Sequence, residues 1–372
     1  MYLILHAFSR RNSGDGLLVD LTLEALEAAG IDRQACEVLA LDPDSFSDLA
    51  HVHRAPGEPS ARPSLRLVGA AFEVLADVFD RALSVSTPVG RVERLARHAS
   101  GMIAVGGGYL VTDSPVRQLG VLLNHFVQLR VAARAGVPTV YLPQSVGPLR
   151  GPVGRWTATL LAQIDRVYAR DYETLAEIRA PNVHRCADLA VMKLARRLDS
   201  LPDVGTGGGR TVIVGRALPR GGDYVARLQE LARSLSSPIW AVQADVRGPR
   251  SDRAFYRQFG LQDADTLAQV LEGRQAGVVV SVRLHGAIAA LLAGRPAIHL
   301  AYERKGWGAF EDLGIAPFVH DARSFDVQQV LAQISELEKD PAHYWSRVRS
   351  AVPALREQYA ELLSDLRELL VA

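Results

Sequence analysis

The sequence predicts an α/β protein with two parallel sheets, each in a domain of its own. Short apolar runs typical of buried strands alternate with helical patterns almost throughout the chain. Its 372 residues exceed what one ordinary hydrophobic core holds, so two domains are expected. The stretch Leu201–Gly209 contains four glycines and separates two series of strands, as a linker would. We therefore expect two Rossmann-like domains facing a cleft.

The order of the elements sets the expected domain boundaries. Residues 1–196 are predicted to form the first domain, residues 197–210 the linker, and residues 211–345 the second domain. Residues 346–372 come after the second sheet is complete, so their helix is available to pack back on the first domain.

In the first domain, apolar runs mark the strands, and apolar residues three or four apart mark the helices. Gly30 and Gly136 follow two of the helical patterns and are typical stop signals. A loop rich in His, Pro and Gly, His51–Pro63, precedes a long helical pattern around Leu65–Leu83. The expected strands are Tyr2–Phe8, Glu37–Leu41, Met102–Val105, Thr139–Pro143 and Val167–Ala169, and the other expected helices are Leu17–Ala29 and Val116–Ala135.

The second domain repeats this alternation with runs rich in β-branched residues. Helices are expected between its strands, and a last apolar-periodic helix, Pro353–Val371, follows them. The expected strands are Thr211–Val214, Ile239–Val242, Val278–Val282 and Ala297–Ala301.

Composition excludes several classes of function. A net charge of +1 provides no electrostatic footprint for nucleic acid or an anionic membrane. The chain shows neither a run of about 18 apolar residues nor a signal peptide. Cys36 and Cys186 lie in or next to apparent strands far apart in sequence, so we interpret them as buried reduced thiols and expect a cytoplasmic protein.

The most informative stretch is the strand Val278–Val282 with the helix that follows it. Polar residues occupy alternate positions at the end of this strand: Ser281, Arg283 and His285. Because ligands bind outside the carboxyl ends of strands in open α/β sheets, Arg283 and His285 are expected at a helix N-terminus that faces a ligand. The alternative is a structural cluster in which the Arg is salt-bridged and the His is buried.

A lysine follows the next expected strand. Nearly all basic residues are Arg, and the only lysines are Lys193, Lys305 and Lys339. Lys305 lies beside Gly306, directly after the strand Ala297–Ala301, which makes it a candidate for contact with an anion.

Weaker motifs follow several strands of the first domain. Asp15 lies in a glycine-containing loop, and Gly106, Gly107 and Gly108 suggest a close approach of a substrate to bare backbone. The alternatives are helix caps and plain turns. Asp113 and Gln144 follow strands as well, and Arg170 is placed to meet a carboxylate or phosphate or to form an internal ion pair with Asp171.

Other patterns carry no chemistry. His51 and His53 have metal-like spacing without further ligands nearby, and Gly205–Gly209 precedes a strand, unlike a P-loop. The sequence has no zinc signature and no nucleophile elbow. We therefore expect no metal and no cofactor.

Taken in order, these motifs resemble the polysaccharide pyruvyl transferase family. The Ser-x-Arg-x-His block with the Tyr-x-x-Lys element is the specific part, and the set spans most of the chain. The elements are Asn12-x-Gly14-Asp15, Gly106-Gly107-Gly108, Gln144-x-x-Gly147-Pro148, Arg170-Asp171, Asp188-Leu189-Ala190, Ser281-x-Arg283-Leu284-His285 and Tyr302-x-x-Lys305.

The resemblance implies a GT-B-like fold and transfer of a pyruvyl group from phosphoenolpyruvate to two hydroxyls of a sugar, which leaves a ketal. The first domain would hold the acceptor, a free, nucleotide-linked or lipid-linked saccharide, and the second most of the donor site. His285 and Arg170 would be the catalytic residues. The expected donor-binding residues are Arg283, Lys305, Ser281 and Arg216, and the expected acceptor-binding residues are Asp15, Gly106, Gly107, Gly108, Asp113 and Gln144.

Two other functions compete with this interpretation. A GT-B glycosyltransferase with a nucleotide-sugar donor also uses a strand, a helix and a Gly-x-Pro turn in its donor domain. No acidic pair follows the Ser281–His285 block to hold a ribose, which disfavours that reading. A non-catalytic relative is disfavoured by the presence of Arg170 and His285. A peripheral association with the inner face of a membrane is compatible with a lipid-linked acceptor.

Overall fold

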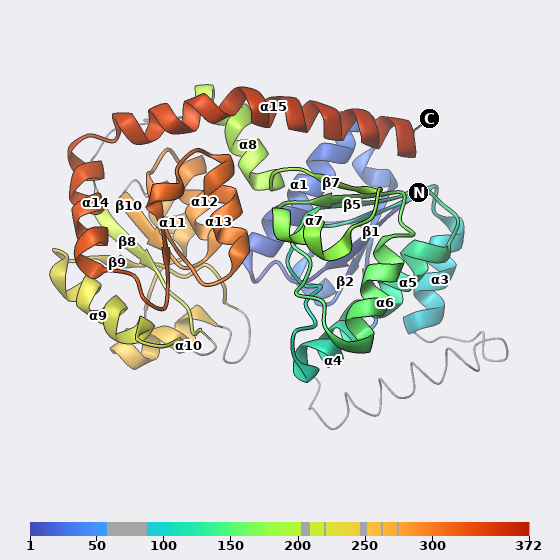
Figure 1. Ribbon diagram of the computed structural model, residues 1–372, viewed down its shortest axis with the longest axis horizontal. Helices are drawn as coiled ribbons and strands as arrows, with labels where there is room; N and C mark the ends of the chain where they lie inside the picture. The colour runs from blue at the N-terminus through green and yellow to red at the C-terminus, as the bar shows by residue number, and fades with distance from the viewer. Residues whose placement is uncertain are drawn as a thin grey trace. The chain divides into compact units, whose positions relative to one another are not determined.

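The computed structural model describes residues 1–57, 88–201, 209–218, 221–245, 251–261, 263–273 and 275–371. The chain divides into two compact units (Figure 1). Unit 1 comprises Met1–Arg10, Asp15–Leu189 and Ala360–Ala372, and unit 2 comprises Arg11–Gly14 and Ala190–Tyr359. Most of the expected linker and the helix expected around Leu65–Leu83 lie outside the described residues.

Unit 1 is built on a seven-stranded parallel sheet of order β3-β2-β1-β4-β5-β6-β7. Its inner strands are almost wholly buried, which is why their sequences are largely apolar, with exceptions such as Glu37 in β2 and His6 in β1. Chain order reverses between β1 and β4, where ligands bind in open α/β sheets. The strands are β1 (Tyr2–Ala7), β2 (Cys36–Ala40), β3 (Val52–Arg54), β4 (Gly101–Ala104), β5 (Thr139–Gln144), β6 (Arg166–Ala169) and β7 (Val183–Arg185).

The helices of unit 1 differ from the prediction at two places. Helix α1 begins at Ser13 instead of Leu17, so Asp15 lies in its first turn and not in a loop. The helix expected at Val116–Ala135 is two helices, because His125 between them has φ −128° and ψ −26°. The helices are α1 (Ser13–Ala29), α3 (Pro88–His98), α4 (Pro115–Asn124), α5 (Phe126–Arg134), α6 (Gly151–Leu161) and α7 (Tyr172–Ile178), and α8 (Leu189–Arg197) follows at the boundary of the units.

The break at His125 has a polar cause. Its Nδ1 lies 3.2 Å from Nδ1 of His6, whose Nε2 lies 2.9 Å from the hydroxyl of Tyr141. The ring of Tyr109 stacks on His125 with centroids 4.6 Å apart. His6, the second-last residue of β1, is in the left-handed region, at φ 65°. A cluster of two imidazoles and two phenols therefore joins the end of β1, the middle of β5 and the loop after β4.

This cluster predicts a loss of stability in mild acid. Burial lowers the pKa of His125 from 6.5 to about 4 and that of His6 well below its usual range. The unfolded chain therefore binds more protons below pH 6.5, and the free energy of unfolding falls as the pH drops from 6.5 towards 4. From His125 alone we expect a loss of about 2 kcal/mol between pH 7 and pH 5, measured by urea denaturation.

His125→Phe is the matched variant, because it keeps a ring beside Tyr109 and removes the titrating group. Its free energy of unfolding should fall less between pH 7 and pH 5 than that of the wild type. Equal slopes for the two proteins would show that His125 does not titrate as proposed.

Unit 2 is built on a five-stranded parallel sheet of order β12-β11-β10-β8-β9. Strand β10 lies at its centre, and all six of its residues are buried. The strands are β8 (Arg210–Val214), β9 (Ile239–Trp240), β10 (Ala276–Ser281), β11 (Ala297–Ala301) and β12 (Val319–Asp321), and the helices are α9 (Tyr224–Ser234), α10 (Asp252–Tyr256), α11 (Leu267–Glu272), α12 (Leu284–Leu292), α13 (Arg304–Asp312) and α14 (Val327–Lys339).

The last helix, α15 (Ala342–Leu370), contributes to both units. It begins well before Pro353, the residue at which the sequence predicted its start, and Pro353 lies inside the helix. Because proline is favoured in the first turn of a helix, it placed the predicted start too late in the chain. In unit 2, Arg356 Nε donates to the carbonyl of Ala195 at 3.0 Å. In unit 1, the hydroxyl of Tyr168 donates to Asp365 at 2.5 Å.

Two further expectations from the sequence concern the burial of the two cysteines and membrane-spanning helices. Cys36 and Cys186 are both buried. Burial raises the pKa of the Cys36 thiol to about 11, so it is protonated at neutral pH. Over the described part of the chain, every helix is too short or too polar to cross a membrane.

Candidate active site

Two arginines lie at matching positions beyond the central strands of unit 2. Val214 at the end of β8 pairs with Ser281 at the end of β10. Arg216 and Arg283 each come two residues after one member of this pair. Because the two strands are parallel neighbours, both arginines lie at the carboxyl edge of the sheet, where ligands bind in such folds.

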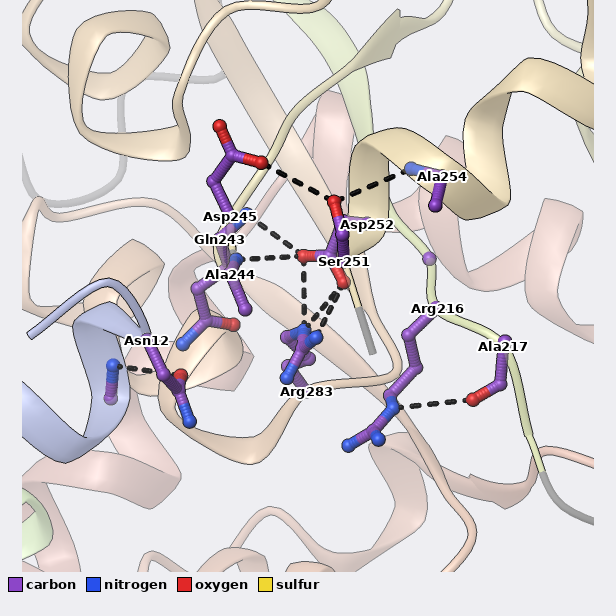
Figure 2. A network of polar contacts seen from close by, with 12 residues as sticks. Asn12, Arg216, Ala217, Gln243, Ala244, Asp245, Ser251, Asp252, Ala254 and Arg283 are labelled. Carbon is purple, nitrogen blue, oxygen red and sulfur yellow. Dashed lines mark hydrogen bonds and ion pairs between the residues drawn. The ribbon is translucent and has the colours of Figure 1, made fainter. Parts of the chain in front are cut away.

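Asp252 holds the guanidinium of Arg283. Arg283 Nε donates to both carboxylate oxygens of Asp252 at 3.0 Å, and Nη2 donates to Oδ1 at 2.5 Å. Figure 2 shows this carboxylate between Arg283 and the backbone of Gln243 and Ala244. The side chain of Asp252 is wholly buried, and that of Arg283 is 9% exposed. The pairing fixes the plane of the guanidinium.

Tyr302 holds the second arginine. Arg216 Nη1 donates to the Tyr302 hydroxyl at 2.6 Å, and its Cζ lies 5.1 Å from the centre of the phenol ring. Arg216 is half-buried. Tyr302 belongs to the Tyr-x-x-Lys element, and Lys305 lies in the first turn of α13. The hydrogen bond from Arg216 to Tyr302 therefore links the residues that follow β8 to those that follow β11.

Ser281 shapes the turn into α12. Its hydroxyl donates to the carbonyl of Arg283 at 2.8 Å and accepts from the Arg283 amide at 3.2 Å. His285 follows in the first turn of α12 and is half-buried. A Cβ at Gly286 would lie 2.5 Å from Gln243 Oε1 and 2.7 Å from Ser281 Oγ. The residue after His285 must therefore be small.

The segment Arg11–Gly14 belongs to this unit and reaches His285. Asn12 forms an antiparallel bridge with Ala244, and both the amide and the hydroxyl of Ser13 donate to the carbonyl of Gln243, at 3.3 and 2.9 Å. A Cβ at Gly14 would lie 2.8 Å from Nδ1 of His285. Gly14 therefore packs directly against the imidazole, which explains a glycine at this position better than a turn does.

Arg170 lies in unit 1 and is buried. Its side chain is 2% exposed; Nη1 donates to Asp188 at 2.5 Å, and Nε donates to the Ser145 hydroxyl at 2.9 Å. Ser145 donates to Asp171, which also caps α7 by accepting from the Thr174 amide at 2.8 Å. The Arg-Asp and Asp-Leu-Ala motifs therefore meet in one buried ion pair that joins β6 to the residue before α8.

The expected acceptor residues lie in different settings of unit 1. A Cβ at Gly106 would lie 2.5 Å from the carbonyl oxygen of Pro143, and one at Gly107 would lie 2.7 Å from the ring of Tyr109. Contacts within the chain thus account for two of the three glycines. Asp113 is exposed and pairs with Arg117 at 3.3 Å.

Gln144 is the unusual member of that set. It is fully buried at the end of β5, and neither amide atom has a hydrogen-bond partner among the described residues. Gly108 follows Gly107 after β4, and Asp15 is half-buried in the first turn of α1. Buried amides are rarely unpaired, so Gln144 is the strongest of the candidate hydrogen-bonding groups in unit 1.

Comparison with known protein families identifies the family of this chain. A sequence model of the family described as polysaccharide pyruvyl transferase matches residues 12–304. The chain belongs to the polysaccharide pyruvyl transferase family. It is therefore a transferase. No curated protein matches the sequence.

Solved structures similar to this transferase are GT-B glycosyltransferases and epimerases. HepE from Anabaena, solved with UDP and glucose, is 14% identical over 98% of this chain and 99% of its own, with a TM-score of 0.56. The UDP-GlcNAc 2-epimerase from Neisseria meningitidis is 11% identical over 97% and 100%, with a TM-score of 0.50. A UDP-glucosyltransferase from Polygonum tinctorium is 12% identical over 100% and 98%, with a TM-score of 0.50. These likenesses confirm the predicted α/β class with parallel sheets and the GT-B-like fold.

Sequence reasoning missed Asp252 and Gln243 in this transferase. Asp252 follows Ser251, which caps the short helix α10, so Ser-Asp is an ordinary helix start in the sequence. Gln243 follows β9 without a motif around it. Among the described residues, no group of three or more His, Cys, Asp or Glu side chains is placed to hold a metal ion.

Proposed function

We propose that this transferase moves a pyruvyl group from phosphoenolpyruvate to two hydroxyls of a sugar in a surface polysaccharide or its precursor. The observation that carries the proposal is the pair of arginines, Arg283 and Arg216, beyond the ends of β10 and β8, with His285 in the first turn of the next helix. Two cations match a donor that bears a carboxylate and a phosphate.

The reaction requires one proton donor at a defined carbon. A proton is added to the methylene carbon of phosphoenolpyruvate, and a sugar hydroxyl adds to the central carbon and loses its proton. The C–O bond to phosphate then breaks, and the second hydroxyl adds at the same carbon and loses its proton. The two protons released balance the one taken up by carbon and the one carried away on hydrogen phosphate.

His285 is the proposed proton donor, because imidazole gains and loses protons near neutral pH. Arg283 and Arg216 bind the two anionic groups of the donor, and Ser281 shapes the turn that carries Arg283. We assign Lys305 to the same anion from its place at the start of α13. The N-terminus of α12 carries the positive end of the helix dipole, which favours negative charge.

We assign the acceptor to unit 1, at the carboxyl ends of β1, β4 and β5. Gln144 is the proposed hydroxyl-binding residue, with Gly106, Gly107, Gly108 and Asp15 nearby in the sequence motifs. Asp113 is the weakest candidate, since it is exposed and paired with Arg117. Arg170 is less exposed in its pair with Asp188 than Arg283 is in its pair with Asp252, 2% against 9%, which supports a structural role for Arg170. The buried Cys36 and Cys186 support a cytoplasmic location, with access to free or membrane-linked precursors.

The experiment is a turnover assay with defined donors. The protein is incubated with phosphoenolpyruvate and a panel of free, nucleotide-linked and lipid-linked sugars, and released phosphate and the new ketal methyl group are measured. Acceptor-dependent release with formation of the ketal supports the proposal. Transfer of a sugar from a nucleotide sugar, with phosphoenolpyruvate inert, overturns it in favour of glycosyl transfer. We expect full activity in the presence of EDTA.

Gly14→Ala tests the contact with His285. Alanine in the first turn of α1 would also place its Cβ 3.0 Å from Cβ of His285, which no rotation of the imidazole relieves, so the free energy of unfolding should fall by about 1–3 kcal/mol. Its Cβ would lie 2.8 Å from Nδ1 of His285 and must displace the imidazole, so kcat should fall at least about tenfold. Both quantities are measured, by urea denaturation and by phosphate release.

Gly120→Ala on α4 is the matched control, because no atom lies within 4 Å of its added Cβ. It should leave kcat unchanged. A Gly14→Ala protein with normal kcat would show that the position of His285 against Gly14 does not matter for turnover.

A further inference from the structure

The carboxylate of Asp252 in unit 2 accepts hydrogen bonds from both an arginine side chain and the backbone. Asp252 is wholly buried and accepts from Nε and Nη2 of Arg283. Its Oδ2 also accepts from the backbone amides of Gln243 at 3.0 Å and Ala244 at 2.8 Å. A buried carboxylate is costly unless charge pairing and hydrogen bonds offset its desolvation, and Asp252 has both.

The partners of Asp252 lead to both halves of the proposed donor site. Arg283 is the anion-binding residue beyond β10. Gln243 and Ala244 pair with Ser13 and Asn12, the segment that sets Gly14 against His285. Figure 2 shows the backbone of Gln243 and Ala244 and the guanidinium of Arg283 converging on the carboxylate of Asp252. One side chain thus supports the cation on one side and the backbone that confines the imidazole on the other.

We propose that Asp252 is the positioning residue of the donor site: it orients Arg283 towards the donor and fixes the backbone of Gln243 and Ala244, which in turn fixes the segment against His285. The proposal rests on the proposed function. It assigns Asp252 no contact with the donor. Bidentate pairing is geometrically specific, so loss of the carboxylate leaves Arg283 charged but without a defined plane.

If Asp252 acted only through its charge, its removal would strengthen donor binding, whereas the positioning role predicts that its removal weakens donor binding. Asp252 places a negative charge beside an arginine that binds an anion, and its removal raises the net positive charge of the site. If Asp252 only tempered Arg283, Asp252→Asn would bind the donor more tightly. If it positions Arg283, Asp252→Asn should raise KM for phosphoenolpyruvate at least about tenfold despite the gain in positive charge.

The experiment compares Asp252→Asn with Asp245→Asn, a control at an aspartate shortly before α10. Asp245 pairs with Arg253 at 3.0 Å and is 54% exposed. We expect Asp252→Asn to raise the KM of the donor, with little change in the KM of the acceptor, and Asp245→Asn to leave both unchanged. A lower donor KM in Asp252→Asn overturns the proposal, as does an unchanged KM with only a lower melting temperature.

Arg283→Lys completes a double-mutant cycle and serves if Asp252→Asn does not fold. It keeps the positive charge and loses the fork that Asp252 orients, so its donor KM should also rise at least about tenfold. If Asp252 acts through Arg283, the double variant should show the KM of Arg283→Lys alone. Fully multiplicative effects, or a normal KM in Arg283→Lys, would overturn the proposal.

Calorimetric binding of inorganic phosphate and of phosphoenolpyruvate separates this proposal from the proposed function. A wild type that binds phosphate but neither binds nor turns over phosphoenolpyruvate refutes the donor assignment, and the Asp252→Asn comparison is then made with phosphate. Weaker phosphate binding in that variant supports the positioning role. A wild type that binds neither anion overturns both proposals.

Discussion

Replacing His285 by alanine should lower phosphoenolpyruvate-dependent phosphate release by about 10²–10⁴-fold while the protein stays folded. General acid–base groups typically contribute this much to a rate, and His285 is the titratable side chain in the first turn of α12. The loss should fall on kcat and not on the donor KM, since the arginines still hold the anion. Single-turnover kinetics with saturating donor measures this effect directly.

His343→Ala is a suitable control, because this histidine of unit 2 is 39% exposed and pairs with Glu336 at 3.4 Å. It should retain wild-type turnover. Near-normal turnover in His285→Ala would remove His285 from the chemistry. A protein that no longer folds would instead show that the imidazole is a structural part of the contact with Gly14.

Replacing Arg170 by alanine should lower the free energy of unfolding by about 3–5 kcal/mol, because the substitution leaves the buried carboxylate of Asp188 without its cation. Ser145 also loses its hydrogen bond from Nε. A loss of this size is a large share of the stability of an ordinary domain. Urea denaturation monitored by intrinsic fluorescence provides the measurement.

Arg117→Ala removes an exposed pair of the same unit and should change the free energy of unfolding by less than about 1 kcal/mol. A different result for Arg170→Ala would contradict the structural role. A variant of normal stability that no longer binds phosphoenolpyruvate would restore Arg170 to the donor site, the role implied by the family resemblance.

Local pattern was sufficient to predict the long buried strands of both sheets, whereas the three-residue edge strands β3, β7 and β12 were not predicted, and β3 lies in a stretch expected to be a loop. Strands such as β10 are buried on both faces, so their apolar runs are unbroken and end where polar residues begin. The position of Ser281, Arg283 and His285 at a strand end followed from the same pattern. The capping role of Asp171 could also be inferred locally, because a cap involves residues only a few positions apart.

Long-range contacts account for what the sequence could not reveal. The break at His125 depends on His6, which is distant in sequence, while the helical period of the chain continues through it. The pairing of Asp252 with Arg283 and of Arg170 with Asp188 likewise joins separate elements. The sequence identified both arginines as anion-binding candidates, and their buried partners became visible only in the folded chain.

The two units are not two continuous pieces of chain. Unit 2 includes Arg11–Gly14 from near the N-terminus, and unit 1 includes the end of α15 from Ala360 onwards. A gene split between Leu189 and Ala190 would therefore produce two incomplete halves. The first half would lack the helix end that contacts Tyr168, and the second would lack the segment Arg11–Gly14, which sets Gly14 against His285. Neither half should be catalytically active by itself. Activity in a mixture of the two halves would show that each missing segment had bound to the unit to which it belongs.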